Sequence, residues 1–361
     1  MNEFKPGLEG VVAFETEIAE PDREGGSLRY RGVDIEELVG SYPFERVWGL
    51  LVDERFEPGL PAAEEYQGGG LSGNTPADLQ AVTARFGAEW KLQKLIDISD
   101  DEAREDLRRL SAQFISIAAQ SARLADGQTD RVDHSLVEQG KSTAERFLLE
   151  WRGEADPKHV RALDTYWICT AEHGLNASTF VARIVASTGA DCAAALSSAV
   201  GALSGPLHGG APARVLPMLD AAAESGDPET YVNDLIERGE RLMGFGHRVY
   251  RAEDPRARLL KGTSKELGAP RYDVAEKLEQ AALVALRKKS PDRPLETNVE
   301  FWSAVVLDVA DVPPQLAPAM FACSRTAGWS AHILEQKKLS RLVRPSARYI
   351  GPNTRSASSI G

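Results

Sequence analysis

The sequence predicts a mostly helical protein with one small β-hairpin near the N-terminus. Three observations support this fold class. From residue 34 onward, apolar residues recur at helical spacing along most of the chain. Capping side chains stand directly before prolines at Thr75-Pro76 and Asp254-Pro255, as is typical of helix starts. The alternating pattern of a strand is confined to the opening segment.

The hairpin is expected between residues 11 and 30. Residues 11–18 alternate loosely, a turn-forming run follows at 21–26, and residues 27–30 resume the pattern. A helix start is predicted at Asp34, because an acid at the N-cap and another three residues later have capping-box spacing. Residues 57–74 include two prolines and five glycines, so this segment is expected to be a surface loop.

The stretch from Ser178 to Leu203 is dense in alanine, serine, glycine and valine. Small residues let helix backbones approach closely, so we expect this stretch to be central, either in the core or in a subunit interface. It stops at Gly205-Pro206, which places His208 in a loop that leaves a buried helix.

Two further helices are expected beyond that loop. Pro212 can start the first, and the apolar residues of 231–242 predict the second. The second is expected to end at Gly244 and Gly246, which would place His247 at a helix exit as well.

Composition limits the classes of function. The content of 42% hydrophobic and 27% charged residues is typical of a globular protein, and 361 residues are enough for a large core and two domains. A formal net charge of −12 argues against binding to nucleic acid or to an anionic membrane. Cys169, Cys192 and Cys323 are far apart in apolar runs, which predicts buried free thiols in a reducing compartment. Neither a signal peptide nor a membrane-spanning run is evident, so a cytoplasmic location is expected.

Two glycine-flanked histidines are the most informative feature. They are His208 in Gly205-Pro206-Leu207-His208-Gly209-Gly210 and His247 in Gly244-Phe245-Gly246-His247-Arg248-Val249-Tyr250. Glycine lets the backbone approach a ligand closely, and histidine exchanges its proton near neutral pH. Together with Glu300, in Thr297-Asn298-Val299-Glu300-Phe301-Trp302, they could perform acid–base chemistry.

Glu300 follows Asn298, a candidate N-cap, and precedes two aromatic residues. Two effects therefore compete on its pKa, because a helix N-terminus favours the ionised carboxylate and apolar surroundings disfavour it. An ionised but poorly solvated carboxylate is a good base for a weakly acidic C–H bond. The alternative is an ordinary first-turn glutamate.

Three arginines are candidate anion ligands. Arg256 falls in the first turn after Asp254-Pro255, where a carboxylate would meet both its guanidinium and free helix N–H groups; the alternative is a solvated helix charge. Arg325 has apolar helical neighbours and needs an anionic partner from the protein or from a ligand. Arg344 could reach a site only through folding or dimerisation. Several arginines beside histidines suggest a small substrate with more than one carboxylate.

The remaining histidines are less informative by themselves. For His173 the alternative is an incidental position in a capping cluster formed by Asn176 and Ser178. His332 is interpreted as a packed core histidine. Since no HxxxH or Cys/His spacing occurs, no metal site is predicted.

Taken together, these motifs resemble those of the citrate synthase family, specifically its compact bacterial type. The resemblance runs almost from end to end. It covers Gly10-Val11-Val12-Ala13, Leu28-Arg29-Tyr30-Arg31-Gly32, Glu172-His173 through Thr179, Gly205 to Gly210, Gly244 to Tyr250, Asp254-Pro255-Arg256, Asn298-Val299-Glu300-Phe301 and Arg325-Thr326-Ala327-Gly328-Trp329.

The resemblance implies condensation of an acyl-CoA, acetyl-CoA in the first instance, with oxaloacetate and water. His208 would hydrogen-bond the thioester carbonyl while Glu300 removes a proton from the acyl methyl. His247 would donate to the ketone of oxaloacetate, and hydrolysis of the citryl thioester would then release citrate and CoA.

The same resemblance implies the binding residues. His173, Arg256 and Arg325 would hold oxaloacetate, and Arg344 would match an arginine that the family supplies from the partner subunit. Coenzyme A, a co-substrate and not a tightly bound cofactor, would contact Met243, Gly244, Phe245, Gly246 and Arg251.

The architecture implied is an all-α homodimer of two-domain subunits. Residues 1–211 and 311–361 would form the large domain, and residues 212–310 a small domain that carries catalytic and CoA-binding loops. Closure of the small domain would assemble the site and exclude water.

Two departures from the family pattern stand out. Glu300 replaces the usual aspartate, and a misplacement on the order of 1 Å can cost ~100-fold in rate. We expect the backbone to retreat and compensate. Residues 211–214, Ala-Pro-Ala-Arg, replace a pattern that has an Asn-Glu dipeptide after the glycine pair.

Two other functions remain open on the sequence. A 2-methylcitrate synthase would take propionyl-CoA by the same mechanism, and one methylene in an apolar pocket discriminates by only ~1–3 kcal/mol. A non-catalytic paralogue that senses oxaloacetate or acyl-CoA is favoured only by Glu300. The intact His208, His247, Arg256 and Arg325 oppose it.

Overall fold

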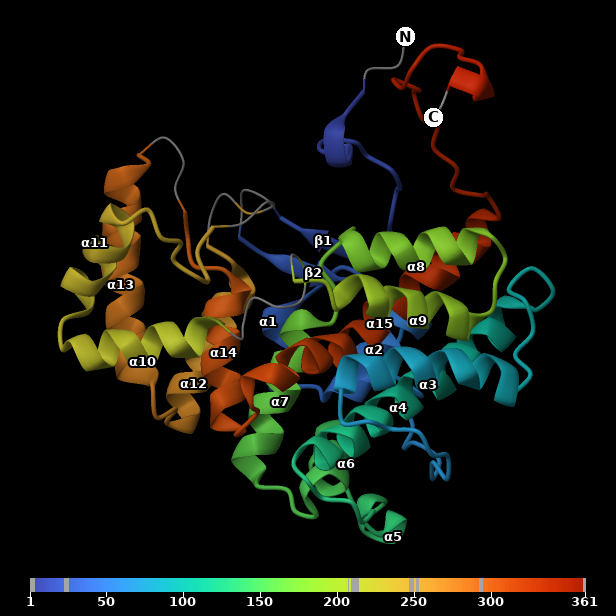
Figure 1. The fold of residues 1–361 in the computed structure, drawn as a ribbon. Coiled ribbons are helices and arrows are strands. Elements are labelled where there is room, and N and C mark those ends of the chain that lie inside the picture. The colour runs from blue at the N-terminus through green and yellow to red at the C-terminus, as the bar shows by residue number, and fades with distance from the viewer. Residues whose placement is uncertain are drawn as a thin grey trace.

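The computed structural model describes residues 4–22, 26–206, 208, 214–246, 250, 253–291 and 295–359. Over these residues the chain is mainly helical, with one small sheet near the N-terminus (Figure 1). The predicted fold class is therefore confirmed. None of the helices in this part of the chain is long and apolar enough to cross a membrane.

The sheet differs in detail from the predicted hairpin. It has three antiparallel strands in the order β1-β2-β3: β1 Ala19–Pro21, β2 Leu28–Tyr30 and β3 Val33–Asp34. Placing the first strand at 11–18 was wrong, because only Ile18 of that segment is buried and a strand needs one face to bury. Positive φ angles at Arg31 and Gly32 turn the chain so that Val33 pairs with Tyr30, which adds a third strand.

Most helices form one large group around α15, Ala317–Leu339, which is buried along most of its length. The other members of this group are α1 Ile35–Leu38, α2 Phe44–Asp53, α3 Thr75–Glu89, α4 Asp100–Ala125, α5 His134–Val137, α6 Thr143–Arg152, α7 Pro157–Thr170, α8 Ala177–Ser187 and α9 Cys192–Leu203. The small-residue stretch corresponds to α8 and α9, and α9 lies in the core, as expected for a central element.

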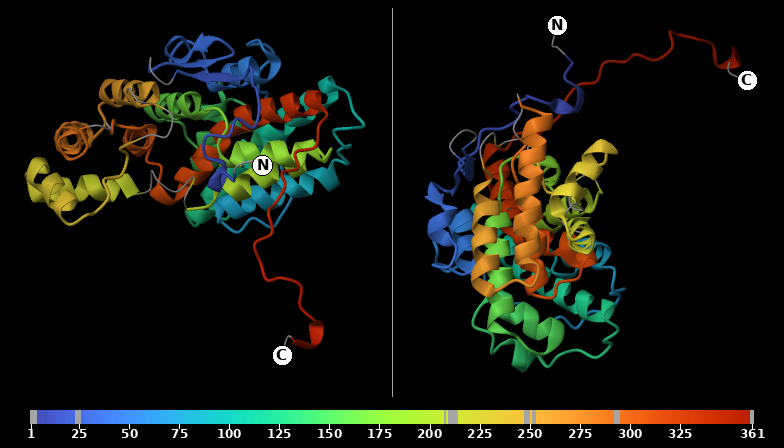
Figure 2. Two further views of the ribbon diagram at one scale, coloured as in Figure 1. Left: turned by 90° about the horizontal axis from the view of Figure 1, so that it is seen from above. Right: turned by 90° about the vertical axis from the view of Figure 1, so that its left-hand side faces the viewer.

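A second group lies to one side of the first, and the two groups can be told apart from above as well (Figures 1 and 2). It consists of α10 Val215–Ser225, α11 Pro228–Glu237, α12 Pro255–Leu267, α13 Tyr272–Lys289 and α14 Val299–Val309. Short 3₁₀ helices occur at Pro6–Leu8, Pro314–Leu316 and Ala357–Ser359.

The helix predicted through Leu242 ends earlier than expected. Helix α11 stops at Glu237 because Gly239 adopts φ +73° and the backbone N–H groups of Gly239 and Glu240 close the last turn on Ile236 and Leu235. Residues 239–246 are therefore a connection without helix, and the prediction that Gly244 ends a helix was wrong.

The capping predictions were correct at one proline and displaced at the other. Asp254 caps α12 by accepting from the backbone nitrogen of Arg256. Asn74, and not Thr75, caps α3. The segment 57–74 between α2 and α3 is a loop without helix or strand, as predicted.

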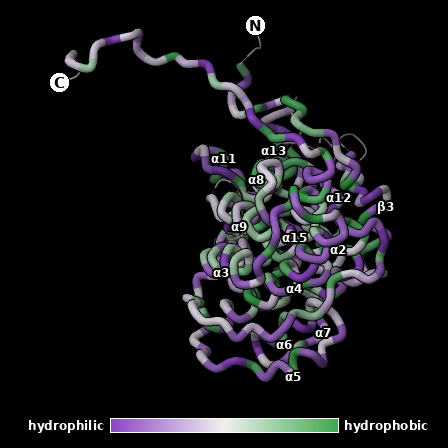
Figure 3. The backbone as a smooth tube through the Cα atoms, turned by 90° about the vertical axis from the view of Figure 1, so that its right-hand side faces the viewer, coloured by the Kyte–Doolittle hydropathy of each residue, from purple (hydrophilic) through white to green (hydrophobic). Residues whose placement is uncertain are grey.

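Both ends of the chain leave the body. The residues after α15 form an exposed, extended tail, and the N-terminal segment departs from the same side (Figures 2 and 3). Cys169, Cys192 and Cys323 are buried free thiols, as predicted.

Candidate active site

His208 lies in the short segment after α9, as predicted. Its Nε2 is 2.9 Å from the Oγ of Ser178 and 3.3 Å from the backbone nitrogen of Ser178, at the start of α8. Because a backbone N–H can only donate, Nε2 accepts, and the proton of the neutral ring is on Nδ1.

Burial lowers the pKa of His208 to about 4, and the guanidinium of Arg325 lowers it further in the same direction. The ring is therefore neutral near pH 7. It can offer its Nδ1–H as a hydrogen-bond donor without first gaining a proton.

Ser178 is a site residue whose second role the sequence did not reveal. It was interpreted only as a capping residue, and Asn176 is the actual N-cap of α8. The Ser178 hydroxyl accepts from Trp329 Nε1 at 3.2 Å, and it can donate its one proton either to Nε2 of His208 or to Oδ1 of Asn176, which is 2.8 Å away. Together with its backbone N–H, which donates to Nε2, Ser178 links His208 to both α8 and α15. No sequence pattern connects residues so far apart; only the fold brings them together.

Arg256 is buried, which rules out the alternative of a solvated helix charge. Its Nε donates to Asp254 Oδ1 at 2.9 Å and its Nη2 donates to Asp254 Oδ2 at 2.8 Å. The same Oδ2 accepts the backbone N–H of Val299 at 3.0 Å. Asp254, which the sequence indicated only as a cap, thus joins Arg256 to the first residue of α14.

Glu300 lies in the first turn of α14, and its backbone N–H donates to the capping side chain of Asn298 at 3.0 Å. The side chain is half-buried. Burial raises the pKa of Glu300 above its usual value; Arg256 and Arg241 oppose this shift, and the carboxylate of Asp254 adds to it. Desolvation therefore outweighs the two guanidinium charges at this carboxyl.

Arg325 is buried on α15. Its Nε donates to the carbonyl oxygen of Thr170 at 2.6 Å, and its guanidinium carbon lies 4.6 Å from the centre of the Phe321 ring. Burial lowers the pKa of Arg325, and the carboxylate of Glu172 opposes this shift. Among the described residues, Nη1 of Arg325 has no hydrogen-bond partner. A buried N–H donor of this kind suits an anionic ligand.

His173 and Arg256 both lie beside the ring of Tyr250. The ring centre of His173 is 5.2 Å from that of Tyr250, and the guanidinium carbon of Arg256 is 5.9 Å from the Tyr250 ring. Asn176 caps α8, as the alternative interpretation predicted. His173 is not incidental, however, because its ring packs against that of Tyr250. Tyr250 was not singled out from the sequence, although it ends the His247 motif.

The segment 243–246, predicted to contact coenzyme A, runs beside the start of α14. Phe245 pairs with Thr297, and Asn298 donates from its backbone to Gly244 and from Nδ2 to Gly246. Gly244 has φ +85°, and a Cβ there would lie 2.6 Å from Cβ of Phe301. Only glycine allows this approach.

A cavity of about 430 Å³ opens beside this segment. Two of its lining residues are cationic, Arg241 and Lys289, and neither was singled out from the sequence. The other lining residues include Ile236, Leu242, Phe245, Gly246, Leu286 and Leu295. The cavity thus combines apolar walls with two cations and one carboxylate, that of Glu240.

Among the described residues, one predicted residue lies apart from the others. His247 and Arg251 lie outside the described residues. Arg344 is exposed in the C-terminal tail, and its neighbour Val343 is bound to Ser187 at the C-terminal end of α8. His208 lies at the opposite end of that helix of eleven residues, a span of roughly 16 Å.

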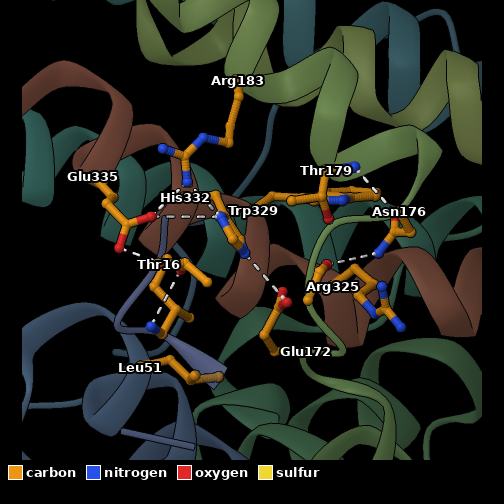
Figure 4. A network of polar contacts seen from close by, with 12 residues as sticks. Thr16, Leu51, Glu172, Asn176, Thr179, Arg183, Arg325, Trp329, His332 and Glu335 are labelled. Atoms are coloured by element: carbon orange, nitrogen blue, oxygen red, sulfur yellow. Dashed lines mark hydrogen bonds and ion pairs between the residues drawn. The ribbon is translucent and has the colours of Figure 1, made fainter. Parts of the chain in front are cut away.

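His332 is a packed core histidine, as interpreted. It lies between Arg183 and Glu172, whose Oε1 is 3.2 Å from its Nε2 (Figure 4). Within the described part of the chain, no three or more His, Cys, Asp or Glu side chains gather in a way that could hold a metal ion.

Comparisons with known proteins place this geometry in context. The family model described as citrate synthase, C-terminal domain, matches residues 7–346. The chain is 58% identical to the protein called "Putative citrate synthase 2" of Mycobacterium tuberculosis, over 99% of this chain and 95% of that one. It is 32% identical to a 2-methylcitrate synthase of Shewanella oneidensis, over 97% and 95% of the two chains. The fold is similar to that of a citrate synthase from Thermoplasma acidophilum, solved as a ternary complex with carboxymethyl coenzyme A and oxaloacetate, with a TM-score of 0.84, 28% identity and coverage of 99% and 98%.

Proposed function

Since this chain belongs to the citrate synthase family and is an enzyme of that type, we propose that it condenses acetyl-CoA with oxaloacetate and water to give citrate and CoA. One observation carries the proposal. A neutral histidine, His208, is fixed at its Nε2 by Ser178, and the fold also provides a carboxyl of raised pKa, Glu300. A neutral imidazole and a poorly solvated carboxylate suit the removal of a proton next to a thioester carbonyl.

In this mechanism Glu300 takes a proton from the acyl methyl while His208 donates a hydrogen bond to the thioester oxygen. The enol-type carbon attacks the ketone of oxaloacetate, and His247 donates a proton to the ketone oxygen as the C–C bond forms. Water then hydrolyses the citryl thioester. The role of His247 rests on its motif.

Oxaloacetate is a dicarboxylate, and the arginines of the site match its charge. We assign its contacts to His173, Arg256 and Arg325; the unpaired Nη1 of buried Arg325 supports this assignment. Arg344 of the partner subunit would complete the site in a homodimer. The exposed tail that carries this residue supports a role across an interface.

Coenzyme A would contact Met243, Gly244, Phe245, Gly246 and Arg251. The cavity beside these residues, with Arg241 and Lys289 in its wall, offers cations for the phosphates of this co-substrate. We further propose that residues 212–310, which include α10–α14, form a small domain that closes on residues 1–211 and 311–361 when both substrates are bound.

The test is release of free thiol from acetyl-CoA and from propionyl-CoA, each with oxaloacetate. Faster release from acetyl-CoA supports citrate synthesis. Faster release from propionyl-CoA would favour the alternative of a 2-methylcitrate synthase, which the Shewanella relative supports. No release from either thioester would favour a non-catalytic sensor.

A further inference from the structure

Each residue of the turn Thr170–Glu172 is hydrogen-bonded to α15, and three of these bonds lie on one face of that helix. The carbonyl oxygen of Thr170 accepts from Arg325 Nε at 2.6 Å, that of Ala171 accepts from the backbone N–H of Gly328 at 3.2 Å, and Glu172 Oε1 lies 3.2 Å from His332 Nε2. Positions 325, 328 and 332 share one face of a helix.

Gly328 makes this close approach possible. A Cβ at position 328 would clash with Oε2 of Glu172 and would lie 2.7 Å from the carbonyl oxygen of Ala171. The carboxylate therefore lies against the bare backbone of α15, one helical turn from Arg325.

Hydrogen-bond chemistry fixes the direction of the contacts around Glu172. Arg183 Nη1 lies 3.0 Å from Nδ1 of His332, and a guanidinium can only donate, so Nδ1 accepts. The ring proton is then on Nε2, which donates to Glu172 Oε1. His332 thus holds one oxygen of Glu172 away from Arg325 (Figure 4).

The remaining feature concerns two buried polar atoms, an acceptor on Glu172 and a donor on Arg325. Over the residues that the structure describes, neither Oε2 of Glu172 nor Nη1 of Arg325 has a hydrogen-bond partner, although both are buried. The two groups form no direct ion pair there, yet Glu172 is the main group that favours the charged form of Arg325.

We propose that Glu172 is a positioning residue: tethered by His332, it balances the charge of Arg325 from a distance and leaves Nη1 open for a carboxylate of the substrate. This inference rests on the proposed role of Arg325 in binding oxaloacetate. Since arginine stays charged in proteins, loss of Glu172 leaves a buried cation without its counter-charge. Loss of His332 leaves a buried carboxylate without its donor, free to turn onto Nη1.

The proposal predicts opposite effects from two variants on the Kd of oxaloacetate, measured by titration calorimetry on the full-length protein. Glu172→Gln removes the competing charge and keeps the size, so oxaloacetate should bind more tightly, by roughly tenfold. His332→Leu lets Glu172 occupy Nη1, so binding should weaken by roughly tenfold. His332→Gln, which restores an N–H donor, should bring the Kd back toward the wild-type value.

The double variant and a matched control separate positioning from general disruption. In Glu172→Gln/His332→Leu no carboxylate can turn onto Arg325, so the weakening should disappear. Glu335→Gln removes a carboxylate that contacts Arg183 and lies 4.0 Å from Nδ1 of His332, the ring nitrogen that does not bond Glu172. Because the bond from Nε2 to Glu172 stays in place, this variant should leave the Kd unchanged.

The outcomes are distinct. If the wild-type protein does not bind oxaloacetate, the proposed function fails and this inference fails with it. If the wild-type protein binds oxaloacetate but Glu172→Gln weakens or does not change the Kd, only the inference is overturned. If the Glu172→Gln variant does not fold, His332→Leu provides the test. An unchanged Kd of oxaloacetate in His332→Leu would also overturn the inference.

Discussion

At the scale of single residues, burial sets the protonation of the two groups that we assign to proton removal. It lowers the pKa of the His208 imidazole to about 4 and raises the pKa of the Glu300 carboxyl. Both shifts favour the uncharged form. A carboxylate that is poorly solvated is a stronger base when ionised, and a neutral imidazole can donate without becoming charged first.

Glu300 is where this chain departs from its family, so it gives the sharpest test at this scale. Glu300→Gln should abolish thiol release and still allow oxaloacetate to bind. Glu300→Asp should lower the rate by roughly 100-fold, because the shorter side chain stops about one C–C bond short of the acyl methyl. The start of α14 is fixed by Asp254 and Gly246, so the helix cannot advance to compensate.

Steady-state kinetics with acetyl-CoA and oxaloacetate measure this prediction. A higher rate in Glu300→Asp would mean that the site has the dimensions of the usual aspartate and merely tolerates glutamate. Equal rates for Glu, Asp and Gln at position 300 would mean that another group takes the proton.

At the scale of helices and turns, the site depends on where elements begin. Asn176 caps α8 beside Ser178, Asn298 caps α14 beside Glu300, and Asp254 caps α12 beside Arg256. A cap fixes the first turn of a helix, so Ser178, Glu300 and Arg256 are each held by a capping side chain two residues earlier in the sequence.

Two glycines on helices offer a matched pair for testing how closely elements pack. Gly328→Ala should destabilise the protein by about 1–3 kcal/mol, because its Cβ would meet Glu172 and Ala171. Gly262→Ala on α12 has no heavy atom within 4 Å of the new Cβ and should stabilise by about 0.5–1 kcal/mol. Urea unfolding measures both; similar effects of the two substitutions would contradict the packing of the 170–172 turn on α15.

The contact between α4 and α6 predicts a pH-dependent stability. Glu150 on α6 accepts from Ser116 Oγ at 2.7 Å and from Gln120 Nε2 at 2.8 Å, and burial raises its pKa to about 7. Below the unfolded-state pKa the carboxyl is protonated in both states and carries no penalty. Between the unfolded value and about pH 7 only the unfolded chain ionises, so wild-type stability falls as pH rises.

Glu150→Gln keeps an acceptor for Ser116 and removes this titration. The variant should match the wild type near pH 4 and exceed its stability by about 3 kcal/mol at pH 8. Glu154→Gln, on the exposed turn after α6, is the control and should show no such trend. A stability difference that stays constant between pH 4 and pH 8 would contradict the buried position of this carboxyl.

The sequence predicted local features better than long-range ones. Helical periodicity, the cap at Asp254 and the cluster of motifs depend on neighbours along the chain. The end of α11 was misplaced because Gly239 terminates it before Gly244, and two glycines so close compete in the pattern. The partnership of Ser178 with His208, and that of Glu172 with His332, arise only when α8, α15 and the turn after α7 pack together.

At the scale of the whole molecule, one proposed residue is separated from the rest. Arg344 lies on an exposed tail beyond α15, whereas His208, Arg256, Arg325 and Glu300 come from buried or half-buried positions in the body. If this arginine binds oxaloacetate, either its tail folds back onto the body or a second copy of the chain brings it to the site. A homodimer with two composite sites provides the second of these arrangements.

Subunit complementation tests the composite site. His208→Ala and Arg344→Leu should each be nearly inactive as homodimers, since each site then lacks one essential group. In a mixed dimer, one site combines both substitutions, and the other combines the intact His208 of one chain with the intact Arg344 of the other. Refolding the two variants together at equal amounts makes about half of the dimers mixed, so about a quarter of all sites should be intact. Thiol release near that fraction of the wild-type rate is the expected result. Recovery of no activity, with mixed dimers demonstrated by differently tagged chains, would show that Arg344 does not act in the partner's site.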